Sequence, residues 1–514
     1  MRTQGPIGAD RPADSTIVPL TPFSSATAML QALQSRRISA VELLDLHLRQ
    51  IAQENPTLNA IVTPDFEQAR RTAKEADVAR AHGDDRLLLG LPVTIKDYLD
   101  VEGLPTTAGD PKKAHAVAAQ DGLVAARVRA AGAVIMGKTN VSLNASDWHA
   151  DNPLFGRTNN PWDRTRTPGG STGGGAAAVA AGMTPLEFGS DFAGSIRVPA
   201  AFCGCYGHNP SATTLPCSGY FPGSPVLNPA RITAVQGPLS RSAADLELAL
   251  GAAGPEIGED TAWHIALPPA RHERLTDYRV AVLPLFPWLP VDDDIVAARE
   301  RLTTWLRQLG TTVEDAQPEL FCDGRTYHQL YVSLMTVVLS LAVPAWARRL
   351  GAVTARLWRD EFAMAYRRGL HASAADYVGW YAQREQFREA YRLFFREWDV
   401  LLAPVCISNA FPHPNPKVPL TRRKLDVNGH TVPYLRLNVY PSLATLCGQP
   451  ATAFPAGQTR AGLPIGLQVI GPYLEDRTTI RFAHLLEQEF GGFRQPRDCR
   501  DETPPSVALP VCEA

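Results

Sequence analysis

The sequence predicts an α/β fold with much parallel strand pairing. Two short apolar runs, residues 88–95 and 133–136, have the length and composition of buried strands. Residues 121–131 between them have helical periodicity, and strands that alternate with helices are typical of parallel pairing. The 514 residues are 45% hydrophobic and 20% charged, which indicates a globular chain with a large core and excludes a disordered one.

Helices are expected ahead of the first strand. Residues 25–55 carry apolar side chains near helical spacing, and residues 66–82 form a second helical segment with a polar face. The strand at 88–95 runs into Lys96 and Asp97. It therefore delivers these two side chains to its C-terminal end.

The second half of the chain also combines strands with helices. Residues 279–285 have a strand pattern and are followed by an amphipathic helix at 292–309. Residues 325–400 are mostly helical in pattern and rich in aromatic side chains. Residues 404–420 contain five prolines and are expected to form an irregular loop, and residues 464–472 return to a strand pattern.

The charge balance and the apolar segments exclude several classes of protein. Lys and Arg number 50 and Asp and Glu 52, so the basic excess of a nucleic-acid-binding or polybasic membrane-surface protein is missing. Residues 1–22 lack the apolar core of a secretory signal. Residues 326–347 carry no charge, but their polar side chains and Pro344 favour a buried helix that lines a pocket over a membrane span. We expect a cytoplasmic protein.

The cysteines and histidines predict no metal site and no disulfide scaffold. Eight cysteines in 514 residues are too few for such a scaffold, and no two of them form a C-x-x-C pair. The twelve histidines show no spacing typical of metal ligands.

One glycine-rich segment has a pattern unlike the rest of the chain. Residues 167–175, Thr-Pro-Gly-Gly-Ser-Thr-Gly-Gly-Gly, contain five glycines and run into a small-residue helix at 176–182. A phosphate-binding loop needs a Lys after the glycines, and a dinucleotide fingerprint needs a strand before them; the sequence has neither. A flexible linker would not lie between two apolar elements with this Ser-Gly pattern. The segment indicates chemistry that involves Ser171.

A second serine and a lysine extend this hypothesis. Ser195 follows Ser171 by 24 positions and also lies in a glycine-containing turn. Lys96 ends an apolar strand 75 positions before Ser171, so the strand would carry its amine inward. A buried lysine tends to lose its proton, because removal from water disfavours the charged form. A neutral Lys96 would serve as a general base for a serine nucleophile.

In these segments the sequence resembles the amidase signature family. The resemblance covers most of the chain and is strongest over residues 86–250. The matching motifs are GLPVTIKD at 90–97, GKTN at 137–140, NPLFG at 152–156, NPW at 160–162, the glycine-serine segment at 167–175, GSDFAGSIRVPA at 189–200, GPLSR at 237–241 and GLPIGLQ at 462–468.

The resemblance implies a Ser–cis-Ser–Lys triad that hydrolyses C–N bonds. It assigns Ser195 as the nucleophile, Ser171 as the bridging serine in a cis peptide with Gly170, and Lys96 as the terminal base. Such a triad needs neither a metal nor an organic cofactor. The implied oxyanion donors are Phe192, Ala193 and Gly194, and the implied supporting residues are Asp191, Arg197 and Thr172.

The same resemblance implies the architecture. It predicts an amidase-signature fold, with a central mixed β-sheet flanked by helices and a helical substrate-side region at about 325–400. We expect one domain over residues 20–495, a signature core at about 86–250, and terminal tails at 1–19 and 496–514. Relatives of this kind also favour a homodimer.

Two positions depart from the pattern of the family. Members commonly have two glycines before the nucleophile, whereas this chain has Ala193 and Gly194. Alanine keeps the amide N–H that an oxyanion hole needs, but a positive φ at Ala193 would cost about 1–2 kcal/mol. Gly175 stands where relatives often have Ser. Neither change touches the triad.

The function that we expect is hydrolysis of small or medium amides through a seryl acyl-enzyme, including anilides, aryl amides, carbamates or related esters. Two alternatives stay open: the A subunit of a tRNA-dependent amidotransferase, and a family member that has lost activity. We predict a pocket for an apolar or aromatic group of a small-molecule substrate. Its predicted walls are Ala145, Ser146, Trp148, Tyr331, Leu334, Met335, Val338 and Tyr440.

Overall fold

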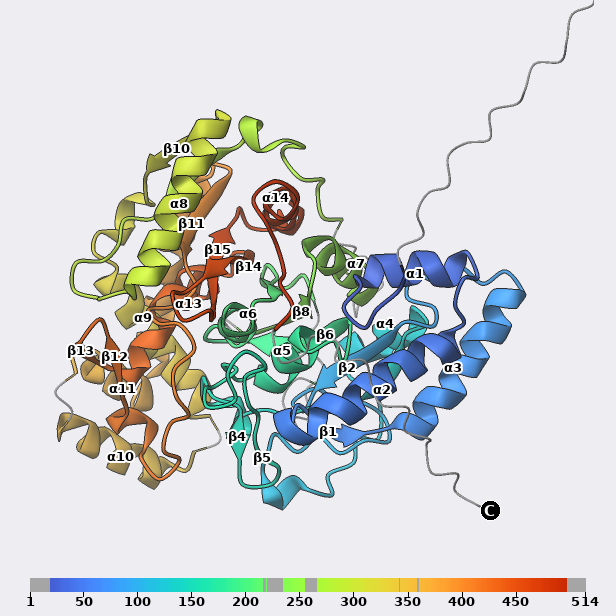
Figure 1. Cartoon of the computed structure of the whole chain (residues 1–514). Coiled ribbons are helices and arrows are strands. Elements are labelled where there is room, and N and C mark those ends of the chain that lie inside the picture. Colours follow the sequence, from blue (N-terminus) through green and yellow to red (C-terminus); the bar gives the residue numbers. More distant parts are fainter. Residues whose placement is uncertain are drawn as a thin grey trace, which may run out of the picture.

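The computed structural model describes residues 19–215, 219, 234–254, 266–341, 343–357 and 360–496. Apart from residues 19 and 496, the two predicted tails lie outside the described residues, as do Cys217, Cys499 and Cys512. One large mixed sheet crosses the molecule and helices flank it (Figure 1). The predicted α/β class and the central mixed sheet are confirmed.

Within the described residues the main sheet has eleven strands. Their spatial order is β1 (Ile61–Pro64), β3 (Val134–Thr139), β2 (Pro92–Lys96), β6 (Leu186–Asp191), β8 (Val235–Ser240), β7 (Tyr206–Asn209), β14 (Ala451–Gln458), β15 (Pro464–Ile470), β11 (Val400–Pro404), β9 (Arg279–Val282) and β10 (Thr312–Asp315). Two further hairpins are β4 (Asp151–Asn152) with β5 (Gly156–Arg157), and β12 (Lys424–Val427) with β13 (His430–Pro433).

Parallel pairing is less extensive than the sequence pattern predicts. It is found where β2 pairs with β3 and β6, and where β9 pairs with β10 and β11. The central pairs β6–β8, β7–β8 and β7–β14 are antiparallel. β14 and β15 also pair antiparallel, because a short turn joins them and a parallel pair needs a long crossover.

The predicted helical segments are present, with one break. The segment at 25–55 forms two helices, because Ser39 begins the second with a capping box in which Glu42 returns the hydrogen bond. The helices of the first half are α1 (Ala26–Gln34), α2 (Ala40–Leu58), α3 (Phe66–Ala81), α4 (Leu123–Ala130), α5 (Gly173–Ala180), α6 (Arg197–Cys203) and α7 (Ala243–Ala253).

The described residues of the region at 325–400 are mostly helical, as predicted. The uncharged run at 326–347 covers one helix and the start of the next, and Pro344 is the N-cap between them. No helix among the described residues is long and apolar enough to cross a membrane. The helices of the second half are α8 (Asp293–Leu309), α9 (Arg325–Leu339), α10 (Ala345–Thr354), α11 (Ala363–Leu370), α12 (Ala374–Phe394), α13 (Val439–Cys447) and α14 (Asp476–Glu489).

Helix α5 packs against the centre of the sheet, and its glycines allow that approach. All eight of its residues are buried. A Cβ on Gly174 would lie 2.4 Å from the backbone nitrogen of Asn140. The helix therefore lies directly on the sheet, where it contacts β2, β6 and β8, and the glycine-serine segment is at its N-terminal end.

Candidate active site

Three separate segments meet at one edge of the sheet. β2 and β6 are parallel neighbours, so their C-terminal ends lie at the same edge. β2 ends in Lys96, and β6 ends in Asp191, four residues before Ser195. The loop before α5 brings Ser171 to the same place.

Lys96 and Ser171 are in direct contact. Both side chains are buried, and Lys96 Nζ lies 2.7 Å from Ser171 Oγ, within hydrogen-bond distance. The peptide bond between Gly170 and Ser171 is cis. A Cβ on Gly170 would lie 2.5 Å from the backbone nitrogen of His149, so a larger residue does not fit before Ser171.

The environment of Lys96 favours the neutral amine. Burial lowers its pKa from 10.5 to about 7, although the carboxylates of Asp191 and Glu187 raise it in part. Near neutral pH a large share of Lys96 therefore has a free lone pair.

Ser195 lies beside this pair. It is 7% exposed, and its carbonyl oxygen accepts a hydrogen bond from the backbone N–H of Thr172 over 3.1 Å. That bond ties the two serine loops together. The Ser195 hydroxyl makes no hydrogen bond within the part of the chain that the structure describes, so its contact with Ser171 stays a prediction. Catalytic hydrogen bonds of this kind are often long until substrate binds.

The loop from Phe192 to Gly194 is fixed from both sides. Tyr331 of α9 donates its hydroxyl hydrogen bond to the Phe192 carbonyl over 2.9 Å. Trp148 Nε1 donates to the Ala193 carbonyl over 2.7 Å. Two of the predicted pocket residues, Trp148 and Tyr331, thus lie against the predicted oxyanion loop.

The positive φ in this loop falls on Gly194, at +90°, and Ala193 is not among the positive-φ residues. The strain considered for Ala193 therefore does not arise. A Cβ on Gly194 would lie 2.7 Å from Pro441 Cγ, so this position needs glycine. The Gly194 N–H donates to Asp191 Oδ1 over 2.7 Å, which leaves the amides of Phe192 and Ala193 as the candidates for an oxyanion hole.

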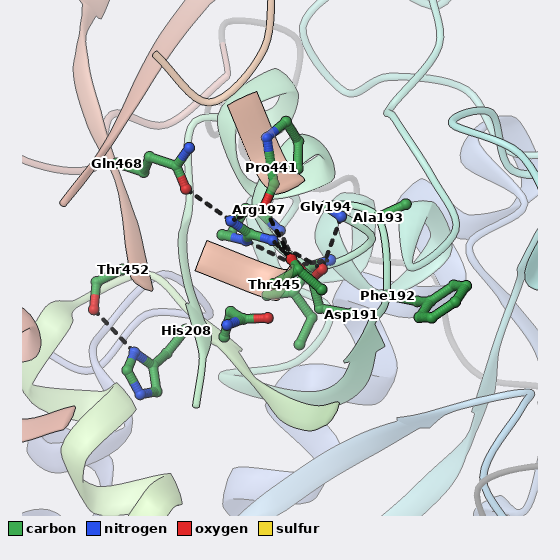
Figure 2. A network of polar contacts seen from close by, with 12 residues as sticks. Asp191, Phe192, Ala193, Gly194, Arg197, His208, Pro441, Thr445, Thr452 and Gln468 are labelled. Atoms are coloured by element: carbon green, nitrogen blue, oxygen red, sulfur yellow. Dashed lines mark hydrogen bonds and ion pairs between the residues drawn. The ribbon is translucent and has the colours of Figure 1, made fainter. Parts of the chain in front are cut away.

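Asp191 and Arg197 form a buried ion pair below the loop, in the centre of Figure 2. Arg197 Nε lies 3.0 Å from Asp191 Oδ2. Arg197 also donates to Gln468 Oε1 and Thr445 Oγ1, each over 2.8 Å, which links α6 to β15 and α13. Burial raises the pKa of Asp191, but Arg197 and the loop N–H groups outweigh it and leave this pKa below its usual value.

The structure adds two residues that the sequence did not indicate. Ser190 Oγ accepts a hydrogen bond from Lys96 Nζ over 2.8 Å. Glu187 is buried, and its Oε1 accepts from Thr139 over 2.6 Å. Burial raises the pKa of Glu187 to about 7, against the effect of its hydrogen bonds. The only local signal for Glu187 is its place between the apolar Leu186 and Phe188, because a carboxyl buried among such neighbours has to be paired or neutral.

Glu187 also explains one departure from the family pattern. A Cβ on Gly175 would lie 2.4 Å from Glu187 Cγ. A serine at 175 therefore has no room beside this carboxyl.

The other predicted pocket residues differ in their exposure to solvent. Ser146 is exposed, Ala145, Met335 and Val338 are half-buried, and Leu334 and Tyr440 are buried. A cavity of about 340 Å³ lies elsewhere, near Gly204 at the end of α6 opposite Ser195. Trp162, Arg301, Phe490 and Arg494 line it, together with the ends of β14 and β15, and none of the predicted pocket residues does. The pocket stays a prediction.

The described residues contain no group of three or more His, Cys, Asp or Glu side chains arranged to hold a metal ion. Buried histidines instead have structural partners. His208 Nδ1 pairs with Thr452 Oγ1 over 2.9 Å (Figure 2), and its Nε2 lies 3.1 Å from Asp476.

Comparison with known proteins agrees with this arrangement. The model of a family described as amidase matches residues 42–480. The α/β fold with its mixed sheet and the match to this family model together indicate an enzyme that acts on amides. The chain belongs to the amidase family, the family of amidase-signature enzymes.

Individual relatives span nearly the whole chain. The A subunit of glutamyl-tRNA(Gln) amidotransferase from Synechococcus sp. (strain CC9605) is 33% identical over an alignment of 486 residues that covers 90% of this chain and 95% of that protein. Indoleacetamide hydrolase of Bradyrhizobium diazoefficiens is 31% identical over an alignment of 465 residues that covers 88% of this chain and 84% of that protein. The solved structure of 6-aminohexanoate cyclic dimer hydrolase superposes with a TM-score of 0.76 at 25% identity, covering 93% of this chain and 99% of that one.

Proposed function

We propose that this enzyme hydrolyses carboxylic amides through a seryl acyl-enzyme, with Ser195 as nucleophile, Ser171 as relay and Lys96 as base. The observation that carries the proposal is the buried contact of 2.7 Å between Lys96 Nζ and Ser171 Oγ. A serine hydroxyl is a weak nucleophile and needs a positioned base. A buried, neutral amine next to a serine supplies that base.

In the proposed reaction a proton is relayed from the serines to Lys96 during attack, and a proton is returned to the leaving amine when the C–N bond breaks. Neutral Lys96 takes the proton of Ser171 while Ser171 takes the proton of Ser195, and Ser195 Oγ bonds to the amide carbon. The Lys96 ammonium then returns its proton to Ser171, Ser171 gives its own proton to the nitrogen of the leaving amine, and the C–N bond breaks. Water attacks the acyl-enzyme with the same proton path and releases the acid.

We assign the oxyanion hole to the backbone N–H groups of Phe192 and Ala193. Gly194 instead holds the turn, because its N–H is bonded to Asp191. The carbonyls of Phe192 and Ala193 are tied to Tyr331 and Trp148, which supports a loop that is ordered before substrate arrives.

For the substrate we propose an amide with an apolar or aryl group, and anilides, carbamates and related esters as further substrates. The aromatic side chains of Trp148 and Tyr331 beside the loop favour such a group. The relative named indoleacetamide hydrolase also favours such a group, because indoleacetamide is an amide that carries an aromatic indole ring. The test is a panel of aliphatic amides, aryl amides, anilides, carbamates and esters, with purified protein, no partner and no glutamine. Turnover of at least one amide is expected, and no turnover on the whole panel would contradict the proposal.

A second candidate function is that of the A subunit of an amidotransferase, because the relative at 33% identity carries that name. Such a protein would hydrolyse glutamine and pass ammonia on within a complex. Glutamine hydrolysis that appears only after partner proteins are added would favour this function over a free amidase. We expect the free enzyme to act alone, as a homodimer.

A further inference from the structure

Lys96 touches two serines, and the triad accounts for only one of them. Lys96 Nζ lies 2.7 Å from Ser171 Oγ, 2.8 Å from Ser190 Oγ and 3.4 Å from the Ser190 carbonyl oxygen. Both Ser190 and Lys96 are buried, with exposed fractions of 1% and 0%. Ser190 thus offers the amine two oxygens, and Ser171 offers one.

These three contacts can take different roles on a neutral amine. The amine has two N–H donors and one lone pair, and the carbonyl oxygen of Ser190 can only accept, so it takes one N–H. When the hydroxyl oxygen of Ser190 accepts the second N–H, the lone pair faces the hydroxyl of Ser171. This is the orientation that proton uptake from Ser171 requires.

After proton uptake the same contacts hold the ammonium. It has three N–H donors, and the three oxygens of Ser171 and Ser190 accept one each. A buried ammonium without an acceptor for each N–H would be costly, because hydrogen bonds to charged groups are the stronger ones.

No charged side chain near Lys96 replaces the hydrogen bonds of Ser190 among the described residues. The carboxylates of Glu187 and Asp191 on β6 raise the pKa of Lys96 through their charge, and Asp191 is ion-paired with Arg197 of α6. The ring of Tyr98 lies 5.9 Å from Nζ, and α5 contributes no charged side chain. Among the described residues, the hydrogen-bond partners of the amine are the two serines alone.

We propose that Ser190 is a positioning residue for Lys96, which aims the amine lone pair at Ser171 and stabilises the ammonium that forms when Lys96 takes the proton. This inference rests on the proposed function, since it concerns the same proton path. It gives a role to a residue at the end of β6 that is not part of the triad.

The test is the pH profile of Ser190→Ala. Loss of an acceptor disfavours the ammonium, so the pKa of Lys96 falls. The acid limb, which is the rise of kcat/KM with pH as Lys96 loses its proton, therefore moves to lower pH by about one unit for an uncharged anilide. The plateau at high pH falls by about 10–100-fold, because the lone pair is no longer aimed. Ser190→Thr, which keeps the hydroxyl, restores the limb and most of the rate.

A matched control is Ser240→Ala on the neighbouring strand β8. The Ser240 hydroxyl bonds the carbonyl of Ser242 over 2.7 Å and does not contact Lys96. This variant should leave the acid limb in place. A purely structural role for Ser190 would lower the rate and the melting temperature without moving the limb, and that result would overturn the proposal.

A second readout separates this inference from the proposed function. The rate at which an organophosphonate modifies Ser195, followed by peptide mass spectrometry, reports activation of the serine without any amide. If the phosphonylation limb shifts in Ser190→Ala although no amide is turned over, the role of Ser190 holds and the proposed function fails. If amides are hydrolysed and the limb stays in place, the role of Ser190 fails and the proposed function holds.

Discussion

Ser195 lies four residues beyond the end of β6, on a loop tied to the Ser171 loop by the bond from Thr172. Ser195→Ala should lower turnover by at least about 10³-fold, because the nucleophile is lost. The side chain is small and makes no hydrogen bond among the described residues, so the melting temperature should stay unchanged. Residual turnover near the wild-type rate would exclude Ser195 as the nucleophile.

We expect Lys96 to set the pH dependence of the proposed reaction. Its pKa of about 7 means that the active, neutral form grows as pH rises through 7, so kcat/KM for an amide should rise with pH and then level off. A flat profile between about pH 6 and 9, with chemistry rate-limiting, would contradict a titrating Lys96. Lys96→Ala should lose several orders of magnitude on amides and less on activated esters, whose leaving groups need no protonation.

Ala193 tests the oxyanion loop. Ala193→Gly should leave activity within about tenfold, because both residues keep the N–H. Ala193→Pro removes that N–H and should cost about 10²–10³ in rate. Kinetics on one amide compare the two variants. If the rate of the Gly variant falls as far as that of the Pro variant, the methyl group of Ala193 is needed to order the loop, and the N–H groups alone do not explain the function of the loop.

The residues of the site differ in how far the sequence predicts them. The burial of Lys96 was predictable, since an apolar strand runs directly into it. Ser190 was not, because its contact depends on the pairing of β2 with β6, where Ile95 lies beside Phe188. That register is set by the folded sheet and not by any local pattern.

At the scale of elements, strand β2 was predictable and strand β6 was not, and the apolar strand β11 was also missed. β2 has a continuous apolar pattern and was expected. β6 was missed, because Glu187, Ser190 and Asp191 are polar although all six residues of the strand are buried. Such a strand has neither an apolar run nor alternation. Its polar groups are stabilised by partners from other elements, which only the fold brings together.

Helix α9 offers a prediction about how an element supports the loop. Tyr331→Phe removes the hydrogen bond to the Phe192 carbonyl, so kcat should fall by about tenfold as the loop loses its fixed orientation. The matched control is Tyr327→Phe on the same helix, whose hydroxyl bonds the Leu443 carbonyl over 2.6 Å. That variant should cost about 1 kcal/mol of unfolding free energy and leave kcat unchanged. Equal losses of kcat in both variants would show that α9 acts through overall stability alone.

At the scale of the molecule, the fold class and the mixed sheet followed from the sequence, but the strand order did not. The sheet joins β7 to β14, which are separated by more than two hundred residues, and this junction places Gln468 of β15 within reach of Arg197. The two halves of the chain thus meet in the central sheet, where β14 and β15 lie beside α6 and β14 pairs with β7 (Figure 1). Periodicity within short windows carries no information about pairing at that separation.

The last prediction concerns metal dependence of the whole enzyme. The described residues offer no cluster of three metal-ligand side chains, and the proposed base is an amine whose charge depends on burial. Dialysis against EDTA or 1,10-phenanthroline should therefore leave the amide hydrolysis rate unchanged, because a metal-activated water is not needed when Lys96 activates a serine. The measurement is kcat/KM before and after chelation, with the metal content checked by mass spectrometry. Loss of activity on chelation that is restored by added zinc would show that a metal takes part and that the proton path through Lys96 and Ser171 is not sufficient for catalysis.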